Sequence, residues 1–582
     1  MNCPSRVDPI VPDGYNQNPN ALNADATTNS DMSHVANARL QRDHRIDPAN
    51  GPATDMEQIE QHADENKGAA RLKALDKSKG SIAVGEEKAH VSGAASEVER
   101  GAGGRGQAPQ WAATGRSVSR RTLGVLRKYA KFVGPGFMVA VAYIDPGNYA
   151  TDVAAGASFR FKLLFIVLMS NIFAIFLQSL CIKLGSVTGM NLAENCKAHL
   201  PPWLNYTLYF FAESAIIATD IAEVIGTAIA LNILINVPLV AGCAISIIDV
   251  LIILIFYRPS GSMKALRGFE VFVMLLVLGV VICFCFELSK IKAPVGEVFH
   301  GFIPSSTLVQ SQALYQACGI LGATVMPHSL YLGSGIVQPR LREFDEANST
   351  LDIPDADSIS SEEIKYRPSL AAIQACMSYS IVELAVSLFT FALFVNSAIL
   401  IVSGASLYGH PEADNADLFS IHDLLARSIA PVAGTLFALA LLLSGTSAGI
   451  VCTIAGQIVS EGQLNWTLKP WLRRLITRSI SITPSIIIAG AVGREGLGKA
   501  LEGSQVALSI ILPFVSAPLL WFTCRGKYMK VAVRQEGVGE SEGEGWVQMR
   551  NHWITSGFAV VIWGVIVVMN VALLVLVGRG DA

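Results

Sequence analysis

The sequence predicts an all-α membrane protein with many spanning helices, preceded by a polar tail. Only 16% of the 582 residues are charged, whereas soluble proteins average about 25%. The deficit is uneven, because residues 1–115 hold 28 of the chain's 91 charged residues. Apolar runs such as 558–577 match a hydrocarbon core of ~30 Å at 1.5 Å per helical residue. This pattern excludes a soluble enzyme and a β-barrel.

The tail, residues 1–115, is predicted to be disordered and cytosolic. It is rich in Gly, Ala, Ser, Asp and Asn and poor in aromatic residues, so it cannot bury enough apolar surface to offset its conformational entropy. Its 12 basic and 16 acidic residues are mixed along the chain, which argues against a polybasic lipid anchor. Its lysines are candidate targets of the ubiquitination machinery. No cleavable signal peptide is recognised, so the first span is expected to serve as the targeting signal.

Eleven apolar segments are predicted to span the bilayer. Ten belong to a membrane core at 116–525, and the last follows a loop within 526–582. Each segment is long and apolar enough to cross the hydrocarbon core as a helix. The predicted spans are 133–155, 163–184, 206–236, 238–257, 268–288, 313–336, 374–402, 430–459, 474–492, 500–523 and 554–577.

Basic residues in the loops set the expected orientation. Lys and Arg are enriched in cytosolic loops, and this rule places the N-terminus in the cytosol. With eleven spans, the C-terminus then lies outside. The glycosylation sequons at Asn205, Asn348 and Asn465 fall on the cytosolic side, so none is expected to carry a glycan. The basic clusters that decide this are at 116–131, 258–267, 473–478 and 525–534.

The centre of the first span combines an acid with a helix break. Asp145 is followed by Pro146, Gly147 and Asn148, and proline removes a backbone donor and clashes with the preceding turn. The break should free carbonyls such as that of Ala142 and present the oxygens of Asp145 and Asn148 to the gap. The alternative is a simple proline kink in which Asp145 only caps a helix. Intramembrane acids are costly, which favours the functional interpretation.

The sixth span repeats this device with different side chains. Pro327 interrupts an apolar run, with Met326 before it and His328 after it. Two broken helices five spans apart indicate an inverted-repeat transporter with its site near the midplane. Spans one to five and six to ten would form the repeats, with the eleventh added. Taken alone, Met326 is equally typical of a core gap-filler, and His328 of a satisfied buried polar group.

The third span carries three acids on one helical face. Glu213, Asp220 and Glu223 are separated by seven and three residues, which is helical spacing. A row of acids in an apolar helix suits a proton or cation route. The alternative is a helix lining a polar interior with protonated or paired acids. For two further intramembrane acids, Asp249 and Glu383, a structural role is favoured.

These groups form a mixed set of metal ligands. Carboxylate, amide and carbonyl oxygens alone would suit Mg²⁺ or Ca²⁺, whereas the thioether of Met326 favours Mn²⁺, Fe²⁺ and Co²⁺ over Ca²⁺. His328 and the third-span acids can exchange protons near neutral pH. The sequence has no cluster of Cys and His residues of the kind that forms a tight zinc site, so such a site is not expected. No nucleophile–base pair, phosphate loop or cofactor motif supports an enzyme, and no cofactor is expected.

Three motifs resemble the Nramp family of proton-coupled divalent metal transporters, especially its fungal members. They are AYIDPGNYATD, TDIAEVIGTAIALN and ATVMPHSLYLGSG, and the resemblance covers about residues 120–525 and, more weakly, the last span. It implies a LeuT-type fold of five plus five helices with broken first and sixth helices. It implies metal ligation by Asp145, Asn148, Met326 and the carbonyls of Ala142 and Ala323. It also implies proton handling by Asp145, His328, Asp220 and Glu223.

The sequence departs from the family pattern at two positions that bear on function. Gly333 stands where many members carry a second His on the sixth span, so the proton route is expected to differ. Ile511, before Leu512, stands where many members carry Gln, which puts a tenth-span ligand in doubt. Gln505 is a tentative substitute for that ligand.

The expected function is secondary active transport of Mn²⁺, Fe²⁺ or related ions into the cytosol with protons, in the plasma membrane or an endosomal or vacuolar membrane. One alternative is an amino-acid or organic-cation carrier on the same fold. That carrier would need a Gly-rich, unwound first helix able to hold a carboxylate, and Asp145 disfavours it. Another alternative is a membrane metal sensor, which would carry a large cytosolic C-terminal domain.

Overall fold

The computed structural model describes residues 134–246, 263–348, 366–409, 417–428, 430–464, 470–534 and 544–580. The predicted tail at 1–115 lies outside the described residues. So do most of the predicted fourth span, of which 239–246 are described as helix, and Asp249 within it. The boundary predicted between a membrane core and the segment after residue 525 stays a prediction.

Both predicted helix breaks are confirmed. The first span consists of α3 (Pro135–Ala142) and α4 (Pro146–Phe159), and the sixth consists of α11 (Ser311–Thr324) and α12 (Pro327–Gly335). In each case the second helix begins with a proline, which tolerates the first helical position because no backbone N–H is needed there. The chain is therefore non-helical for three residues in the first span and two in the sixth.

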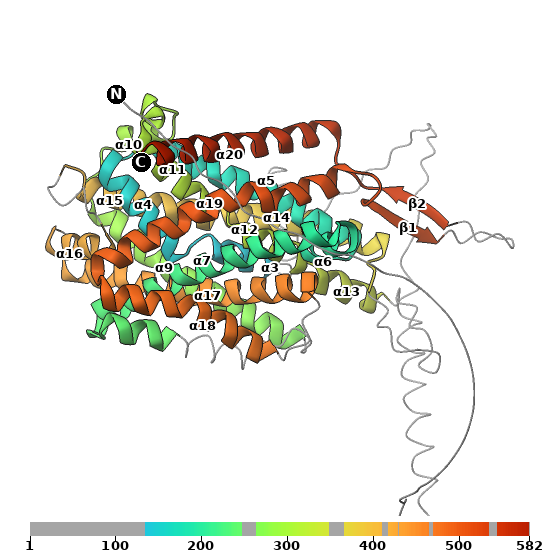
Figure 1. Ribbon diagram of the computed structural model, residues 1–582, viewed down its shortest axis with the longest axis horizontal. Coiled ribbons are helices and arrows are strands. Elements are labelled where there is room, and N and C mark those ends of the chain that lie inside the picture. The colour runs from blue at the N-terminus through green and yellow to red at the C-terminus, as the bar shows by residue number, and fades with distance from the viewer. Residues whose placement is uncertain are drawn as a thin grey trace, which may run out of the picture. The chain divides into compact units, whose positions relative to one another are not determined.

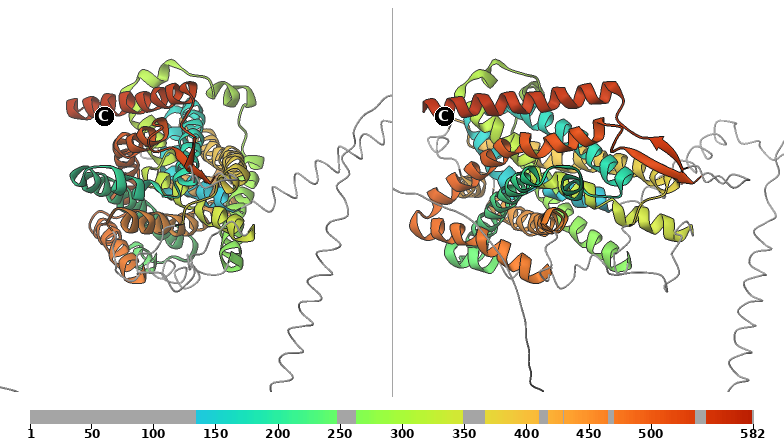
Figure 2. Two further views of the ribbon diagram at one scale, coloured as in Figure 1. Left: turned by 90° about the vertical axis from the view of Figure 1, so that its right-hand side faces the viewer. Right: turned by 45° about the vertical axis from the view of Figure 1, so that its right-hand side comes forward.

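The remaining elements are mostly long apolar helices (Figures 1 and 2). They are α5 (Leu164–Thr188), α6 (Leu192–His199), α7 (Pro202–Ile235), α9 (Met263–Lys290), α10 (Val295–Gly301), η1 (Ser306–Val309), α13 (Gln338–Ala347), α14 (Leu370–Ser387), η2 (Leu388–Ala392), α15 (Leu393–Ser406), α16 (Leu418–Ser428), α17 (Pro431–Leu464), α18 (Pro470–Ala491), α19 (Arg494–Cys524) and α20 (Trp553–Arg579).

The predicted class, a polytopic all-α membrane protein, is confirmed. Within the described ranges, eight helical segments are long and apolar enough to cross a bilayer. The two short halves of the broken first span and the shorter apolar stretch Leu475–Ala491 of α18 lie outside that count. The total of eleven spans stays a prediction, because the fourth is only partly described.

One element was not foreseen in the sequence. The expected loop between the last two spans contains an antiparallel hairpin of β1 (Lys530–Arg534) and β2 (Glu544–Gln548), with Lys530 opposite Gln548. The hairpin projects from the end of α19 (Figure 1). It connects α19 to α20, and the backbone N–H of Asn551 donates to the carbonyl of Thr523 at 3.0 Å.

The broken helices lie at the centre of the packing. α4 contacts α15, α11 and α19, while α7 contacts α17, α19 and α18. The approach of α7 to the first break is very close, since a Cβ on Gly226 would lie 2.3 Å from the Cβ of Pro146. Only glycine allows this distance, so Gly226 brings the acidic helix α7 beside the break.

Candidate metal centre

Each helix break leaves one carbonyl without its usual helical partner. The carbonyl of Ala142 would normally accept from the residue four positions later, which is Pro146 and has no N–H. The carbonyl of Ala323 stands in the same relation to Pro327. The two breaks are also close in space, because the Asn148 amide nitrogen is 3.1 Å from the Ala323 carbonyl oxygen. The breaks therefore bring backbone and side-chain oxygens from α4 and α11 together.

Asp145 is fully buried and caps α4. Its carboxylate accepts from the backbone N–H of Gly147 at 3.2 Å and of Asn148 at 3.1 Å, and from the side-chain amide of Asn148 at 2.5 Å. An acid at a helix N-terminus satisfies otherwise unpaired donors. The sequence Asp-Pro-Gly-Asn thus folds locally so that the carboxylate is fixed at the break.

The side-chain amide of Asn148 occupies the space between two acceptors. Its nitrogen lies 2.5 Å from Oδ1 of Asp145 and 3.1 Å from the carbonyl of Ala323. Its Oδ1 faces Thr324 and Asn396, which donate at 3.5 Å and 3.4 Å. The two ends of an amide are assigned from such hydrogen bonds. Turning the amide over would direct Oδ1, in place of the amide nitrogen, towards Asp145 and the carbonyl of Ala323.

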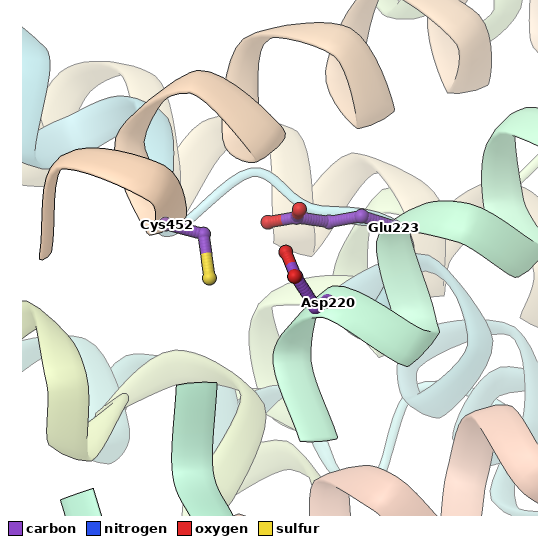
Figure 3. A group of neighbouring side chains, drawn as sticks. All are labelled: Asp220, Glu223 and Cys452. Carbon is purple, nitrogen blue, oxygen red and sulfur yellow. The ribbon is translucent and has the colours of Figure 1, made fainter. Parts of the chain in front are cut away.

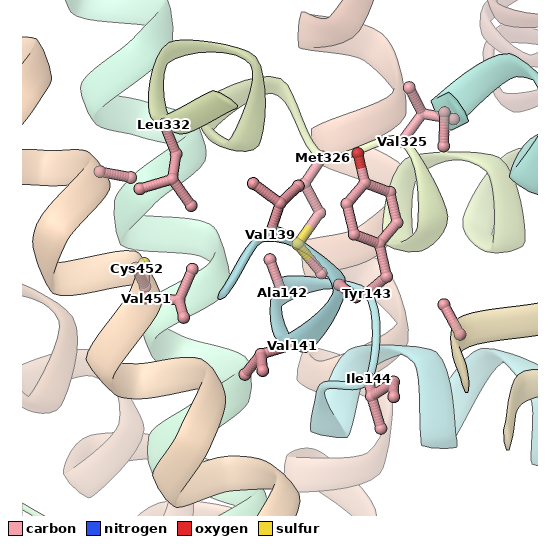
Figure 4. Close-up of a cluster of buried hydrophobic side chains, with 14 of the residues drawn as sticks. Val139, Val141, Ala142, Tyr143, Ile144, Val325, Met326, Leu332, Val451 and Cys452 are labelled. Atoms are coloured by element: carbon pink, nitrogen blue, oxygen red, sulfur yellow. The ribbon is translucent and has the colours of Figure 1, made fainter. Parts of the chain in front are cut away.

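Met326 and Ala142 complete the predicted set from opposite breaks. Both side chains are buried, and Met326 is the residue immediately before α12. Figure 4 shows them in one cluster of buried side chains beside the non-helical segments of both spans. The thioether is therefore held away from solvent in the region that contains the freed carbonyls.

Gln178 of α5 links the two breaks through hydrogen bonds to a residue of each span. Its amide nitrogen donates to the Tyr143 hydroxyl at 2.9 Å and to the carbonyl and hydroxyl oxygens of Ser329 at 3.0 and 2.9 Å. A Cβ on Gly333 would lie 2.0 Å from Oε1 of Gln178. Gln178 thus fills the space that a larger side chain at 333 would need, which gives a physical reason for glycine at this position.

Gln505, the substitute considered for the missing tenth-span ligand, lies beside the first break, whereas Ile511 does not. Gln505 is fully buried on α19, and a Cβ on Gly147 would lie 2.2 Å from its amide nitrogen. Within the described residues its Oε1 has no hydrogen-bond partner. Ile511 instead packs against the apolar core. Gln505 is therefore a buried polar side chain of α19 beside the first break.

Two of the three acids of the third span, Asp220 and Glu223, form a buried ion-pair cluster, and Glu213 is not part of it. Nη1 of Arg478 on α18 lies 2.6 Å from Oδ1 of Asp220 and 3.2 Å from Oε2 of Glu223, and Ser481 donates to Asp220 at 2.9 Å. All these side chains are buried. In the sequence, Arg478 belongs to the basic cluster at 473–478, which indicates only the orientation of the chain. An Arg inside an apolar stretch was the signal that could have marked it as a partner of the acids.

Cys452 of α17 lies against the same acids. Figure 3 shows Asp220 and Glu223 projecting from α7 towards Cys452, and their candidate ligand atoms lie within 4.8 Å of one another. Arg478 already forms an ion pair with each of these two carboxylates. A guanidinium in that position opposes a cation, so this cluster fits proton handling better than metal binding.

His328 connects the metal region with the acid cluster. Its Nδ1 lies 3.3 Å from the hydroxyl of Thr219, the residue before Asp220. By contrast, Glu383 lies elsewhere, paired with Arg340 at 3.1 Å and accepting from the Gly134 N–H at 2.6 Å. That pairing gives Glu383 the structural role expected for it.

The chain resembles characterised metal transporters along most of its length. The model of the family described as natural resistance-associated macrophage protein-like (Nramp) matches residues 136–538. The manganese transporter SMF1 of Saccharomyces cerevisiae is 53% identical over 80% of this chain and 89% of its own length. The iron transporter SMF3 of the same yeast is 55% identical over 71% and 85% of the two chains. A crystal structure of the Eremococcus coleocola manganese transporter has a TM-score of 0.63 and 29% identity, covering 78% of this chain and 87% of that one.

Proposed function

The chain belongs to the Nramp family, and from that premise we propose that it is a secondary active transporter for divalent transition-metal ions such as Mn²⁺ and Fe²⁺. Transport runs into the cytosol and is coupled to protons. The observation that carries this proposal is the meeting of two helix breaks, one bearing Asp145 and Asn148 and the other Met326. The transporter names of the relatives also agree with the lack of an enzymatic motif.

Five groups are assigned to the metal ion. The Asp145 carboxylate supplies charge, the Asn148 amide turns its oxygen inward, and the carbonyls of Ala142 and Ala323 supply neutral oxygens. The Met326 sulfur adds a soft ligand, which favours Mn²⁺ and Fe²⁺ over the harder Ca²⁺. Weak, mixed ligation suits a site from which the ion must leave again. No resident cofactor is part of this proposal.

Gln505 is assigned as a further metal ligand from α19. Two observations support this assignment. The buried Oε1 of Gln505 has no hydrogen-bond partner among the described residues, and its amide nitrogen would lie 2.2 Å from a Cβ placed on Gly147. A buried amide oxygen without a partner is costly, and an arriving cation would provide one. With Gln505, the assigned ligands come from both halves of the first and sixth spans and from α19.

Protons are assigned to Asp145, His328, Asp220 and Glu223. An incoming metal ion competes with a proton for the Asp145 carboxylate. His328 lies 3.3 Å from the hydroxyl of Thr219, the residue before Asp220 on α7, and Arg478 pairs with both acids of α7. Proton release from the break can therefore follow a route separate from that of the metal. The mechanism proposed is alternating access around this fixed site.

The proposal places the N-terminus in the cytosol of a plasma, endosomal or vacuolar membrane. Basic residues predominate at the ends of spans on that side. The side-chain amides of two sequons, Asn205 and Asn348, donate to the carbonyls of Gln463 and Phe344 at 3.2 and 2.8 Å. The third, Asn465, lies outside the described residues. Detection of a glycan on any of them would contradict the orientation.

Uptake by the purified protein in proteoliposomes tests the function directly. We expect uptake of Mn²⁺ and Fe²⁺ that rises when the outside is acidic, and little uptake of Mg²⁺ or Ca²⁺. Mn²⁺ uptake indifferent to the pH gradient would contradict proton coupling while leaving metal transport intact. Competition by amino acids, with none by Mn²⁺, would favour the alternative of an amino-acid carrier.

A further inference from the structure

A large apolar groove lies between α7, α19 and α20, away from the metal site. Its volume is about 730 Å³, and α19 contacts both of the other helices. α20 and α19 run side by side in the ribbon views of Figures 1 and 2. None of the residues assigned to metal or protons lines this groove. Its wall combines the start of α7, the second half of α19 and the middle of α20.

The groove has the depth of one bilayer leaflet. Along α19 its wall extends from Ile510 to Trp521, about 16 Å at 1.5 Å per residue, and a leaflet is half of a ~30 Å hydrocarbon core. The polar donors of the wall are used within the protein. The Trp563 indole donates to the Pro513 carbonyl and the Asn570 amide to the Ile566 carbonyl, each at 2.9 Å. Such a wall suits a hydrocarbon chain rather than a polar solute.

The mouth of the groove is aromatic and basic. The rings of His199 and Tyr528, both of which line the groove, are 4.8 Å apart. The guanidinium of Arg525 lies 3.3 Å from the ring centre of Trp521, and the ammonium of Lys527 lies 5.6 Å from that of Tyr528. Aromatic rings beside Lys and Arg are typical of the interface between hydrocarbon and head groups.

The basic side chains at the mouth are available to an anion. Arg525 and Lys527 are exposed, and neither pairs with a carboxylate within the part of the chain that the structure describes. Burial and the nearby Lys527 lower the pKa of His199 from its usual value, which favours its neutral form. The mouth therefore presents two positive charges directly above an apolar wall.

We propose that this groove binds an anionic phospholipid, with an acyl chain along α7, α19 and α20 and the head-group phosphate between Arg525 and Lys527. Arginine pairs with phosphate through two parallel N–H donors, and lysine binds it as a point charge. The cytosolic leaflet, which this end of α19 is predicted to face, is the anionic one. A zwitterionic lipid would fill the wall equally well but would gain less at the mouth.

The position of the lipid would couple it to the transport helices. α7 carries Asp220 and Glu223, α19 carries Gln505, and both helices form walls of the groove. A bound chain would bridge these helices where Phe211 stacks on Phe514 with ring centres 4.9 Å apart. The binding itself does not depend on the metal proposed above, so the two proposals can fail separately.

Photolabelling of the full chain in phosphatidylcholine vesicles tests the proposal. The probe is phosphatidylserine with a photoreactive group in one acyl chain, and the labelled peptides are identified by mass spectrometry. We expect saturable labelling within 200–211, 510–521 and 563–574. Unlabelled phosphatidylserine should compete better than phosphatidylcholine, by about fivefold for each basic residue involved. Labelling that never saturates, or equal competition by the two lipids, would overturn the proposal.

Matched variants distinguish the contribution of the basic mouth to lipid binding from that of the apolar wall. Arg525→Gln with Lys527→Gln should abolish the preference for phosphatidylserine, whereas Lys290→Gln with Lys292→Gln, exposed residues at the end of α9, should preserve it. Ala517→Phe should fill the groove and suppress labelling by either lipid. Each variant is first shown to be monodisperse and to unfold at the temperature of the unmodified protein. Preference unchanged in the Arg525 and Lys527 variant, or crosslinks between two copies of the chain through these segments, would refute lipid binding.

Discussion

At both helix breaks the second helix begins with a proline, but the residues around the two breaks differ. At the first, neighbouring helices hold the freed carbonyls, since Asn396 donates to Tyr143 at 3.1 Å and Ser444 to Ile144 at 2.7 Å. At the second, the Ala323 carbonyl accepts from Asn148 of α4 at 3.1 Å, while the Met326 carbonyl accepts only locally, from the hydroxyl of Ser329 at 2.8 Å. The comparison suggests a division of labour in which the first break supplies fixed charge and the second supplies selectivity and the proton connection.

The largest effect is expected from removing the charge at the first break. Asp145→Ala should lower Mn²⁺ uptake at least about 100-fold, which corresponds to ~2.7 kcal/mol or more, because no other described carboxylate caps α4. Uptake in proteoliposomes measures this. Glu346→Ala, which removes an exposed acid paired with Arg342, is the control and should transport normally. Near-normal uptake by Asp145→Ala would remove the first break from the metal site.

The next effect concerns the packing behind the second break. Gly333→His should destabilise the protein by about 1–3 kcal/mol, the usual cost of overpacking, because the ring needs the space of the Gln178 amide. Adding Gln178→Ala should restore part of this loss. Thermal unfolding monitored by size-exclusion chromatography gives the result. Equal melting temperatures for the single and double variants would show that Gln178 is not what excludes a larger side chain.

A smaller change is expected from the soft ligand. Met326→Ala should retain measurable Mn²⁺ uptake but improve relative Ca²⁺ uptake by roughly tenfold, since only oxygen ligands would remain. Met326→Leu keeps the volume without the sulfur and separates packing from ligation. Competition of Ca²⁺ with radioactive Mn²⁺ measures the ratio. If Met326→Leu excludes Ca²⁺ as well as the unmodified protein, selectivity does not come from the thioether.

The smallest effect on rate is expected at the proton connection. His328→Ala should slow Mn²⁺ uptake by roughly fivefold and flatten its dependence on external pH, because imidazole exchanges protons near neutrality. Thr219→Val, which removes only the hydroxyl 3.3 Å from His328, should show a weaker form of the same change. A pH profile unaltered by His328→Ala would place the proton route elsewhere.

The sequence predicts the breaks well because proline acts locally. Pro146 and Pro327 each forbid one backbone hydrogen bond whatever surrounds them. Proline alone does not decide a break, however, because Pro484, Pro513 and Pro518 lie inside the continuous helices α18 and α19. The composition of the long apolar helices is equally local, and most predicted spans coincide with helices.

Features that depend on helix rotation and long-range contact could not be predicted. Whether Gln505 or residue 511 faces the break depends on how α19 is turned against α4, and its spacing alone leaves this open. Asn396 and Arg478 reach their partners from helices more than 240 residues away in the chain. The β1–β2 hairpin is short, and part of its connection lies outside the described residues.

The carbonyls that proline sets free have a consequence for how metal preference can change. An oxygen from residue 142 or 323 is present whichever amino acid occupies those positions, so no point substitution there can delete it. Such substitutions alter only the crowding around the ion. In the proposed site, ion preference can therefore be changed mainly by substituting the four side-chain ligands, at 145, 148, 326 and 505. Directed libraries limited to these four codons would sample most of the chemistry that the site can reach.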